Sequence, residues 1–538
     1  MGEQGSGNGR ASPVADDVAD DVSDDVADNV AAMIEPHPGD DVALIGSNRS
    51  TTYGELRALV AGARGGLLAM DVGRGERVAV ICGNSRSFVV AYLAAVGVGA
   101  VVVPLNPTSP PAELERELRT VSPVAVVVDR TSMPNWTGIA AGSVPSVRHV
   151  VVCGADVPAP ASDRPSYIGL DDLVAHPPAD LVAVDPDDVA VMMFTSGTAG
   201  APRAAMLTHR NLRSNIQQGL SARSPIRSDD VVYGVLPLFH IFGLNVVLGL
   251  SLTVGASVLL VQRFDPATAA DSVLSRGVTV LPGAPAMWVA FAHFDELPAD
   301  AFVNVRLALS GASRLPVAAA ERCRERFGLT IAEGYGLTEA SPVVTSSAGL
   351  PPHFGSVGRA LSGVEVRLVG DDGEDALVGD VGELLVRGPN VFVGYLDDPE
   401  ATARVLDRDG WLHTGDLATV DEEGWLYLVD RAKDLIIVSG FNVFPAEVEE
   451  VLVGYPGVAE VAVVGVPHPH TGEAVKAYVV VTQGAAVDED SIIAYAGDHL
   501  ARYKCPTKVV VVDELPRNLN GKLLRRNLAS TVLDDTVA

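Results

Sequence analysis

From Thr52 onward, the apolar positions alternate between the spacing of helices and that of buried strands. Thr52 and Glu55 form a capping-box pattern at the start of an apolar-periodic stretch, which predicts a helix. The runs RVAVIC and AVVVPLN predict buried strands on either side of a second helical stretch, FVVAYLAAVGVG. PAELERELRTV and AVVVD continue the same order. Such alternation predicts an α/β fold, in which helices cover a largely parallel sheet.

The pattern changes further along the chain. Across residues 355–430, short apolar runs such as GELLVRG and GWLYLVD are separated by Gly, Asp and Asn turns, which predicts a smaller, strand-rich subdomain. Residues 434–538 alternate short helical and strand patterns, enough for one compact α+β domain. The sequence therefore predicts a large N-terminal part and a small C-terminal domain.

One apolar segment, residues 241–260, is long enough by hydropathy to cross a bilayer. Three glycines, Asn245 and three hydroxyl residues interrupt it. Its end, ASVLLVQ, has the pattern of a buried strand that follows a short helix. We therefore expect a helix and a strand inside the fold, and no transmembrane segment.

Charge is the next feature that narrows the function. The formal net charge of -29 argues against nucleic acid and anionic membranes as general partners, since both attract positive fields. Much of the acid lies in residues 1–41, whose repeat ADDVADDVSDDVADNV places Val18, Val22, Val26 and Val30 on one drifting stripe. We expect residues 1–41 to form a solvated acidic arm, with a partner-binding amphipathic helix as the alternative.

The cysteines indicate a reducing compartment. Cys82, Cys153, Cys323 and Cys505 are far apart, with no CxxC pair and no histidine cluster nearby, so neither a zinc site nor a disulfide framework is predicted. The N-terminus is acidic, unlike the basic and then apolar start of a secretory signal. The predicted location is the cytoplasm.

A glycine-rich loop lies between two apolar runs, VAVMMF and AAML, that predict short buried strands. Glycine lets a backbone approach a ligand closely, and successive N–H groups form an anion-binding nest. The loop indicates phosphate binding, with an ordinary turn as the alternative; its candidate residues are Thr195, Ser196, Gly197, Thr198 and Gly200. It is not a GxxxxGK[ST] loop, because Pro202 and Arg203 follow it.

Further motifs follow this loop along the chain: PLFHIFG (237–243), SGASRL (310–315), GYGLTEASP (334–342), GELLVRGPNVFVGY (382–395), WLHTGDL (411–417), DRAKDLIIVSGFNVFPAEVEE (430–450) and PRNLNGKLLRR (516–526). Together they resemble the acyl-CoA synthetase and fatty-acid–CoA ligase branch of the adenylate-forming superfamily. The resemblance covers roughly residues 45–530. Any one motif can arise by chance, whereas the ordered set is specific.

The resemblance implies an architecture and a two-step reaction. The implied N-terminal domain combines parallel-sheet αβα layers with a small distorted β-barrel subdomain, and a small, mobile α+β domain follows it. The implied boundaries are 42–430 for the AMP-binding domain, 431–433 for a hinge and 434–538 for the C-terminal domain. A carboxylate would attack the α-phosphate of ATP, and coenzyme A would then displace AMP. Mg²⁺ is implied as well, since both steps build up negative charge on oxygens.

The resemblance also implies which residues hold the nucleotide. The phosphates are assigned to the loop residues together with Arg203 and Thr338, and Mg²⁺ to Thr195 and Glu339. Adenine and ribose are assigned to Ser310, Gly311, Ala312, Gly334, Tyr335, Gly336, Asp416 and Arg431. An ionised carboxylate such as Asp416 accepts two charge-assisted hydrogen bonds, which suits the ribose hydroxyls. The structural alternatives are a buried tyrosine, a turn aspartate and a surface arginine.

Two lysines are assigned to different stages of the reaction. Lys522 follows Asn520 and Gly521, a tight-turn signal, so we expect its ammonium at the tip of a turn. The resemblance implies that Lys522 bridges the carboxylate and the α-phosphate, and that the small domain then swings about Lys433. The loop that admits the thiol of coenzyme A is assigned to Gly440, Phe441 and Asn442.

His240 resembles the gating position between the carboxylate site and the pantetheine channel. Its structural alternative is a histidine satisfied within the core.

Near Lys522, the basic residues Arg517, Arg525 and Arg526 stand out on an acidic chain. We expect them to steer phosphate-bearing ligands, with a solvated basic face as the alternative.

The loop departs from the family pattern TSGTTGxPKGV at three positions, where this chain has Ala199, Arg203 and Ala204. Arginine is a planar fork and not a compact ammonium, so the exchange for lysine is not conservative at a phosphate. We expect Arg203→Lys to raise the rate of adenylation.

The leading hypothesis is an ATP-dependent ligase that joins a small-molecule carboxylic acid, favoured to be a fatty acid, to coenzyme A. The first alternative is an enzyme that loads a fatty or aryl acid onto a separate carrier protein. A weakened adenylate- or lipid-binding regulator and a light-emitting oxygenase are the others. Peripheral membrane contact and self-association stay open, and the sequence does not determine the acid.

Overall fold

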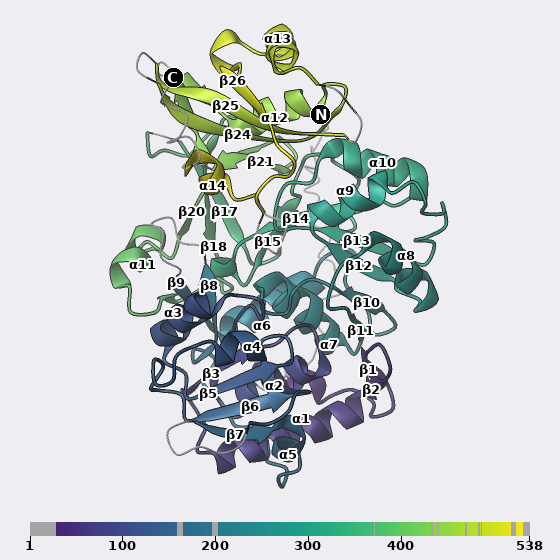
Figure 1. Ribbon diagram of the computed structural model, residues 1–538, viewed down its shortest axis with the longest axis vertical. Coiled ribbons are helices and arrows are strands. Elements are labelled where there is room, and N and C mark those ends of the chain that lie inside the picture. The colour runs from purple at the N-terminus through teal and green to yellow at the C-terminus, as the bar shows by residue number, and fades with distance from the viewer. Residues whose placement is uncertain are drawn as a thin grey trace, which may run out of the picture.

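Strands from distant parts of the chain assemble the large N-terminal body (Figure 1). The computed structural model describes residues 28–158, 165–195, 203–370, 372–431, 434–438, 441–468, 471–482, 485, 487–517 and 523–530. These residues form sheets of eight, nine, four and five strands. The first two sheets are largely parallel, which confirms the α/β prediction.

The eight-stranded sheet carries the first predicted elements. Its strands are β3 (Arg77–Ile81), β4 (Val101–Pro104), β5 (Ala125–Asp129), β6 (His149–Cys153), β7 (Ser166–Gly169), β8 (Val189–Thr195), β9 (Arg203–Thr208) and β19 (Gly394–Tyr395). Its helices include α1 (Tyr53–Ala69), α2 (Arg86–Gly97), α3 (Pro111–Val121), α4 (Met133–Thr137) and α5 (Leu170–Val174). The capping box of Thr52 and Glu55 opens α1, and α2 is buried from Phe88 to Gly97, as an almost wholly apolar helix requires.

The nine-stranded sheet forms the other half of the body. Its strands are β1 (Val42–Ile45), β2 (Ser50–Thr52), β10 (Val231–Gly234), β11 (Ser257–Leu260), β12 (Val280–Gly283), β13 (Leu307–Ser310), β14 (Ile331–Gly336), β15 (Val343–Ser346) and β16 (Arg359–Ala360). Its helices are α6 (His209–Leu220), α7 (Leu250–Val254), α8 (Pro266–Ser275), α9 (Pro285–His293) and α10 (Val317–Phe327). The strands β13 and β14 are parallel, so both end at the same edge of the sheet.

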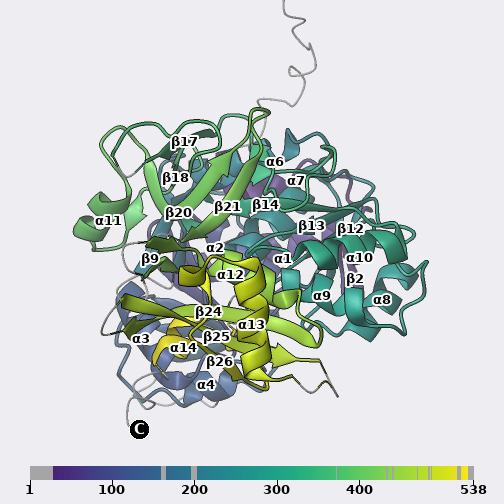
Figure 2. The same ribbon diagram turned by 90° about the horizontal axis from the view of Figure 1, so that it is seen from above.

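Two smaller sheets follow along the chain. The antiparallel, four-stranded one contains β17 (Glu365–Val369), β18 (Gly382–Arg387), β20 (Leu412–Val420) and β21 (Leu426–Arg431), with α11 (Pro399–Val405) nearby. The C-terminal one contains β22 (Ile436–Val438), β23 (Phe441–Val443), β24 (Val458–His468), β25 (Gly472–Val481) and β26 (Lys508–Val511), with α12 (Pro445–Val453), α13 (Glu489–His499) and α14 (Arg525–Ser530). Figures 1 and 2 show the C-terminal elements gathered at one end of the molecule. The strand-rich subdomain and the small C-terminal domain are both confirmed.

The apolar segment 241–260 lies inside the fold. It forms the π-helix η2 (Phe242–Gly249), the short helix α7 and the strand β11. The Asn245 side chain donates to the Leu212 and Ser341 carbonyls at 3.1 and 2.7 Å, which explains how an amide is accommodated in so apolar a segment. None of the described helices combines the length and the apolar character that a bilayer crossing needs.

The predicted acidic arm, residues 1–41, is wrong in its C-terminal part. Residues 1–27 lie outside the described residues, but Val30–Ile34 form a buried 3₁₀ helix, η1. Val30, expected on a solvated stripe, is 2% exposed. The Asn29 side chain anchors this turn by donating to the Val96 and Val182 carbonyls, each at 3.1 Å. The sequence run VAAMI is wholly apolar, and burial against the body outweighs the acidic pattern that precedes it.

Candidate active site

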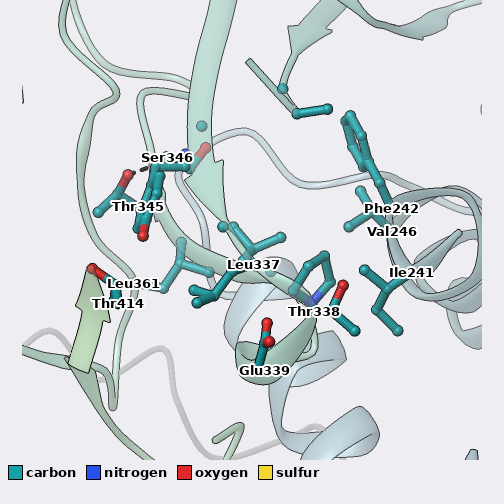
Figure 3. A pocket seen from close by; sticks show the side chains of 18 of the residues that line it. Ile241, Phe242, Val246, Leu337, Thr338, Glu339, Thr345, Ser346, Leu361 and Thr414 are labelled. Atoms are coloured by element: carbon teal, nitrogen blue, oxygen red, sulfur yellow. Dashed lines mark hydrogen bonds between the residues drawn. The ribbon is translucent and has the colours of Figure 1, made fainter. Parts of the chain in front are cut away.

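A cavity of about 520 Å³ opens where the sheets of the N-terminal body meet the four-stranded sheet (Figure 3). Its walls come from β8, β9, β13, β14, β15 and β20 together with η2. The predicted site residues that line it are Thr195, Arg203, His240, Ser310, Gly311, Ala312, Gly334, Tyr335, Gly336, Thr338, Glu339 and Asp416. The fold therefore collects residues that lie more than 200 positions apart in the sequence.

The predicted phosphate loop connects β8 and β9. These strands pair antiparallel with Thr195 opposite Arg203, so the predicted buried strands on either side of the loop are confirmed. Ser196, Gly197, Thr198 and Gly200 lie outside the described residues. The two residues at the loop's ends both line the cavity.

The residues predicted for adenine follow β13 directly. A Cβ added to Gly311 would lie 3.0 Å from the Phe242 ring, a tight contact that favours glycine where the chain leaves β13. Ala312 adopts a φ of 74°, in the left-handed region that turns the chain at the cavity wall. Among the described residues, the buried hydroxyl of Ser310 has no hydrogen-bond partner. A buried polar group of this kind is suited to bonding a ligand.

The residues predicted for ribose come together across two sheets. The Tyr335 hydroxyl, from β14, donates to Oδ2 of Asp416, from β20, at 2.6 Å. Asp416 is 6% exposed, and its backbone pairs with that of Arg431 across β20 and β21. The side chain of Arg431 lies outside the described part. The Tyr335 hydroxyl orients the carboxylate, and a carboxylate facing the cavity is the group expected to accept from a diol.

Glu339 occupies the 3₁₀ turn η3 (Thr338–Ala340) directly after the Gly334–Gly336 stretch, and Figure 3 shows its carboxylate beside Thr338. Oε1 of Glu339 accepts from the Tyr395 hydroxyl at 2.7 Å. Within the described residues, no cluster of three or more His, Cys, Asp or Glu side chains could hold a metal. One carboxylate and the Thr195 hydroxyl, which lines the same cavity, still fit Mg²⁺, which takes few protein ligands when substrate phosphates supply the others.

His240 lies two residues before η2 and lines the cavity. Its Nδ1 accepts from the backbone N–H of Phe242 at 3.3 Å, which orients the ring. Figure 3 shows Ile241, Phe242 and Val246 projecting together from this helix, opposite Leu361 and Thr414. π-Helical turns often accompany functional sites, and here one forms the apolar wall.

The residues predicted for the acceptor step are not brought to the cavity among the described residues. Phe441, on β23, is 54% exposed and stacks on Tyr503 with ring centroids 4.7 Å apart. The backbone of Asn442 pairs with that of Ile437 between β23 and β22. Lys433, Gly440 and Lys522 lie outside the described residues, so their roles stay predictions.

Two of the basic residues expected to steer phosphates are held by acids of the small domain. Arg517 contacts Glu460 at 2.7 Å, and Arg525 contacts Glu449 at 2.7 Å. These ion pairs favour a structural role for both arginines.

Two cavity residues were missed from the sequence. Glu333, on β14, is buried, and burial raises its pKa to about 7. It stands directly before the Gly334–Gly336 stretch, and that position was the available signal. Tyr395 ends the motif GELLVRGPNVFVGY, but nothing in that run indicates that its hydroxyl reaches Glu339.

The described residues predicted for phosphate, ribose and metal line one cavity beside an apolar wall, an arrangement expected of an adenylate-forming enzyme. The family model described as AMP-binding enzyme matches residues 31–396, and that of the AMP-binding enzyme C-terminal domain matches residues 447–522. The chain therefore belongs to the AMP-binding enzyme family. The resemblance found in the motifs is confirmed.

Relatives specify the branch of that family. The chain is 38% identical over 504 residues to 3-[(3aS,4S,7aS)-7a-methyl-1,5-dioxo-octahydro-1H-inden-4-yl]propanoyl:CoA ligase of Mycobacterium tuberculosis, covering 91% of this chain and 95% of that one. It is 34% identical over 478 residues to a long-chain-fatty-acid–CoA ligase of Bacillus subtilis, covering 85% of each. The chain is thus an enzyme of the acyl-CoA synthetase branch, for which ATP, Mg²⁺ and coenzyme A are the expected cofactors.

Solved structures agree with the fold. ATP-bound MatB from Rhodopseudomonas palustris superposes with a TM-score of 0.87 at 34% identity, covering 94% of this chain and 99% of that one. Among the other relatives is a feruloyl-CoA synthase of Amycolatopsis, 38% identical over 496 residues and covering 92% of this chain and 96% of that one. Acids of very different shape are thus named across these relatives, so the likeness defines the reaction and leaves the acid open.

Proposed function

We propose that this enzyme activates an apolar carboxylic acid, in first place a fatty acid, as an acyl-adenylate and transfers the acyl group to coenzyme A. The observation that supports this most directly is the division of the cavity. Polar groups come from Thr195, Thr338, Glu339 and Asp416, while Ile241 directly before η2, Val246 of η2 and Leu250 of α7 supply an apolar wall. A cavity of that kind suits a nucleotide beside an alkyl chain.

In the first step, a carboxylate oxygen attacks the α-phosphorus of ATP, and the bond from that phosphorus to the bridging oxygen breaks to release pyrophosphate. Ser310, Gly311 and Ala312 would lie along adenine, with Gly334, Tyr335 and Gly336 beside it. Asp416 would accept hydrogen bonds from the ribose hydroxyls, and Arg431 would support the same ribose. The β8–β9 loop with Thr338 and Lys522 would stabilise the charge that develops on the phosphate oxygens.

Glu339 and Thr195 would hold Mg²⁺, which when bound neutralises charge on the phosphates. The chain's own part is to present the Glu339 carboxylate and the Thr195 hydroxyl, which both line the cavity. His240 would separate the carboxylate site from the channel of the incoming thiol.

In the second step, the sulfur of coenzyme A attacks the acyl carbon, AMP leaves and the thiol proton is lost to solvent. We propose that Lys522 first withdraws as the small domain turns about Lys433. Gly440, Phe441 and Asn442 would then border the thiol. The exposed position of Phe441 supports a loop that contacts the ligand in only one of two domain arrangements.

The wall itself favours an aliphatic acid over an aromatic one. Besides η2, the cavity is lined by the aliphatic side chains of Ile226, Leu307, Leu309, Val343 and Leu361. Branched aliphatic side chains bury an alkyl chain without demanding a flat ring. Location in the cytoplasm, contact with membrane surfaces and self-association remain predictions that this cavity does not address.

A panel of C2 to C18 fatty acids and aryl acids, assayed for pyrophosphate and AMP release with and without coenzyme A, tests the proposal. We expect pyrophosphate with alkyl acids, and AMP with an acyl-CoA product only when coenzyme A is present. Adenylate that accumulates despite coenzyme A would favour the carrier-protein alternative. Failure to release pyrophosphate with every acid would favour the regulator.

A further inference from the structure

The segment that leads from β18 to α11 joins the outgoing strand of the phosphate loop to Glu339. The backbone N–H of Phe392 donates to the Glu339 carbonyl at 2.8 Å. Three residues on, Tyr395 pairs antiparallel with Ala205 of β9, and the N–H of Leu396 donates to the Ala204 carbonyl at 2.9 Å. One short stretch is therefore hydrogen-bonded at one end to η3, the turn that carries Glu339, and at the other end to β9.

Tyr395 extends this connection to the carboxylate. Its side chain is 9% exposed, and its hydroxyl donates to Oε1 of Glu339 at 2.7 Å. Its ring packs edge-on against Phe392 with centroids 5.0 Å apart, which restricts its rotation.

Arg203 secures the same segment from the other side. Its Nε lies 3.0 Å from Oδ2 of Asp398, and its guanidinium carbon lies 5.7 Å from the centre of the Tyr395 ring. The other oxygen of Asp398 accepts from the N–H of Ala401 and caps α11. A lysine has no nitrogen at the Nε position, so this bond depends on the arginine that distinguishes the loop of this chain.

We propose that Tyr395 is a positioning residue that fixes the Glu339 carboxylate for the nucleotide-bound cation, and that the Arg203–Asp398 ion pair holds Tyr395 in that position. The inference rests on the proposed role of Glu339. It adds a second task to Arg203, which acts on the carboxylate through the segment that it anchors. The earlier expectation for Arg203→Lys is thereby reversed, since lysine would lose the Nε bond.

The test compares Tyr395→Phe with the parent and with Tyr427→Phe. Tyr427 is a matched control because its hydroxyl also donates to a carboxylate, Oδ2 of Asp421 at 3.2 Å, on the four-stranded sheet and away from the cavity. The readout is the rise in Tm that ATP produces in the presence and absence of Mg²⁺, followed by KM and kcat for pyrophosphate release.

For the same rise in Tm, Tyr395→Phe should need about tenfold more Mg·ATP than the parent. This is the range for losing a hydrogen bond to a charged group. Binding of ATP without Mg²⁺ should not change, and Tyr427→Phe should match the parent. Tyr395→Phe combined with Glu339→Gln should be no worse than Glu339→Gln alone, because the tyrosine acts through that carboxylate. Unchanged Mg·ATP dependence in Tyr395→Phe, or fully additive effects, would overturn the inference.

Two further variants examine the ion pair. Asp398→Asn keeps a side chain that caps α11 equally well but removes the charge that Arg203 contacts. Asp398→Asn and Arg203→Lys should each weaken the Mg²⁺-dependent stabilisation about threefold, less than Tyr395→Phe. A stronger Mg·ATP response in either variant would refute the role of the pair. If Glu339→Gln itself leaves the Mg²⁺ dependence intact, the proposed role of Glu339 fails and the inference falls with it.

Discussion

His209 should make the stability of the N-terminal body depend on pH. It is the first residue of α6 and is almost wholly buried, and its Nδ1 accepts from the backbone N–H of Val30 at 3.0 Å. Burial lowers the pKa of His209 to about 4. Protonation would remove the acceptor for Val30 and place a positive charge at a helix N-terminus, where the helix dipole disfavours it. The ring is therefore neutral in the folded protein.

The magnitude follows from proton linkage. Between the ordinary pKa of 6.5 and about 4, the unfolded chain binds a proton that the folded chain does not, so stability falls as the pH falls through this window. His209 should cost about 1 kcal/mol of unfolding free energy between about pH 7.5 and about pH 5.5. Glu117 and Glu333, whose pKa values burial raises to about 7, act in the opposite direction. The pH dependence of the parent's unfolding free energy therefore does not isolate His209. The difference in this pH dependence between the parent and a His209 variant does.

The assay is urea unfolding of the parent and of His209→Asn at both pH values, followed by tryptophan fluorescence. All four tryptophans precede the C-terminal domain: Trp136 and Trp288 belong to the N-terminal body, and Trp411 and Trp425 directly precede β20 and β21 of the four-stranded sheet. Asparagine has a carbonyl oxygen that can accept from Val30 but takes up no proton. The variant should lose about 1 kcal/mol less than the parent on acidification. Equal losses would refute the reasoning that His209 is held neutral by its burial.

Further predictions concern the reaction and the corrected N-terminal segment. Lys522→Ala should slow acyl-adenylate formation about 10²- to 10³-fold and spare transfer from preformed acyl-AMP to CoA, whereas Lys433→Pro should do the reverse; equal loss of both half-reactions in both variants would contradict the alternating mechanism. Tyr335→Phe removes the hydroxyl that donates to Asp416 and should raise KM for ATP about fivefold with little change in kcat; steady-state kinetics with an unchanged KM would show that the carboxylate is oriented by other contacts. Asn29→Ala should lower the unfolding free energy by about 2 kcal/mol, because the Val96 and Val182 carbonyls lose their donor; an unchanged urea midpoint would show that this anchor is dispensable.

Elements with a strong local signal were predicted well. The capping box at Thr52 placed the start of α1, and the strands and helices through Asp129 follow the predicted order. The segment 241–260 was correctly assigned to a helix and a strand, although its π-helical geometry was not foreseen. These features depend on the periodicity of apolar residues, which can be recognised from the local sequence alone.

Features that depend on distant partners were missed. The run VAAMI lies next to an acidic repeat, and its burial follows from packing against α1, α2, α6 and α7, which come later in the chain. Glu333 and Tyr395 are ordinary residues in their own segments, and their significance comes from what faces them across the cavity. The arginine expected to bind phosphate has an ion pair with Asp398, 195 positions further along the chain.

The sequence by itself determined the class of fold, the order of the elements and the family. Local periodicity and the order of the motifs are properties of the linear chain and do not depend on its three-dimensional structure. Only the tertiary structure decided which side chains meet. The pairing of β9 with β19 joins Arg203 to the segment that carries Tyr395, and the end of β14 meets β20 so that Tyr335 reaches Asp416. Hydrogen bonds and ion pairs act over a few ångströms, so they form only after the packing of the sheets has brought remote residues within reach.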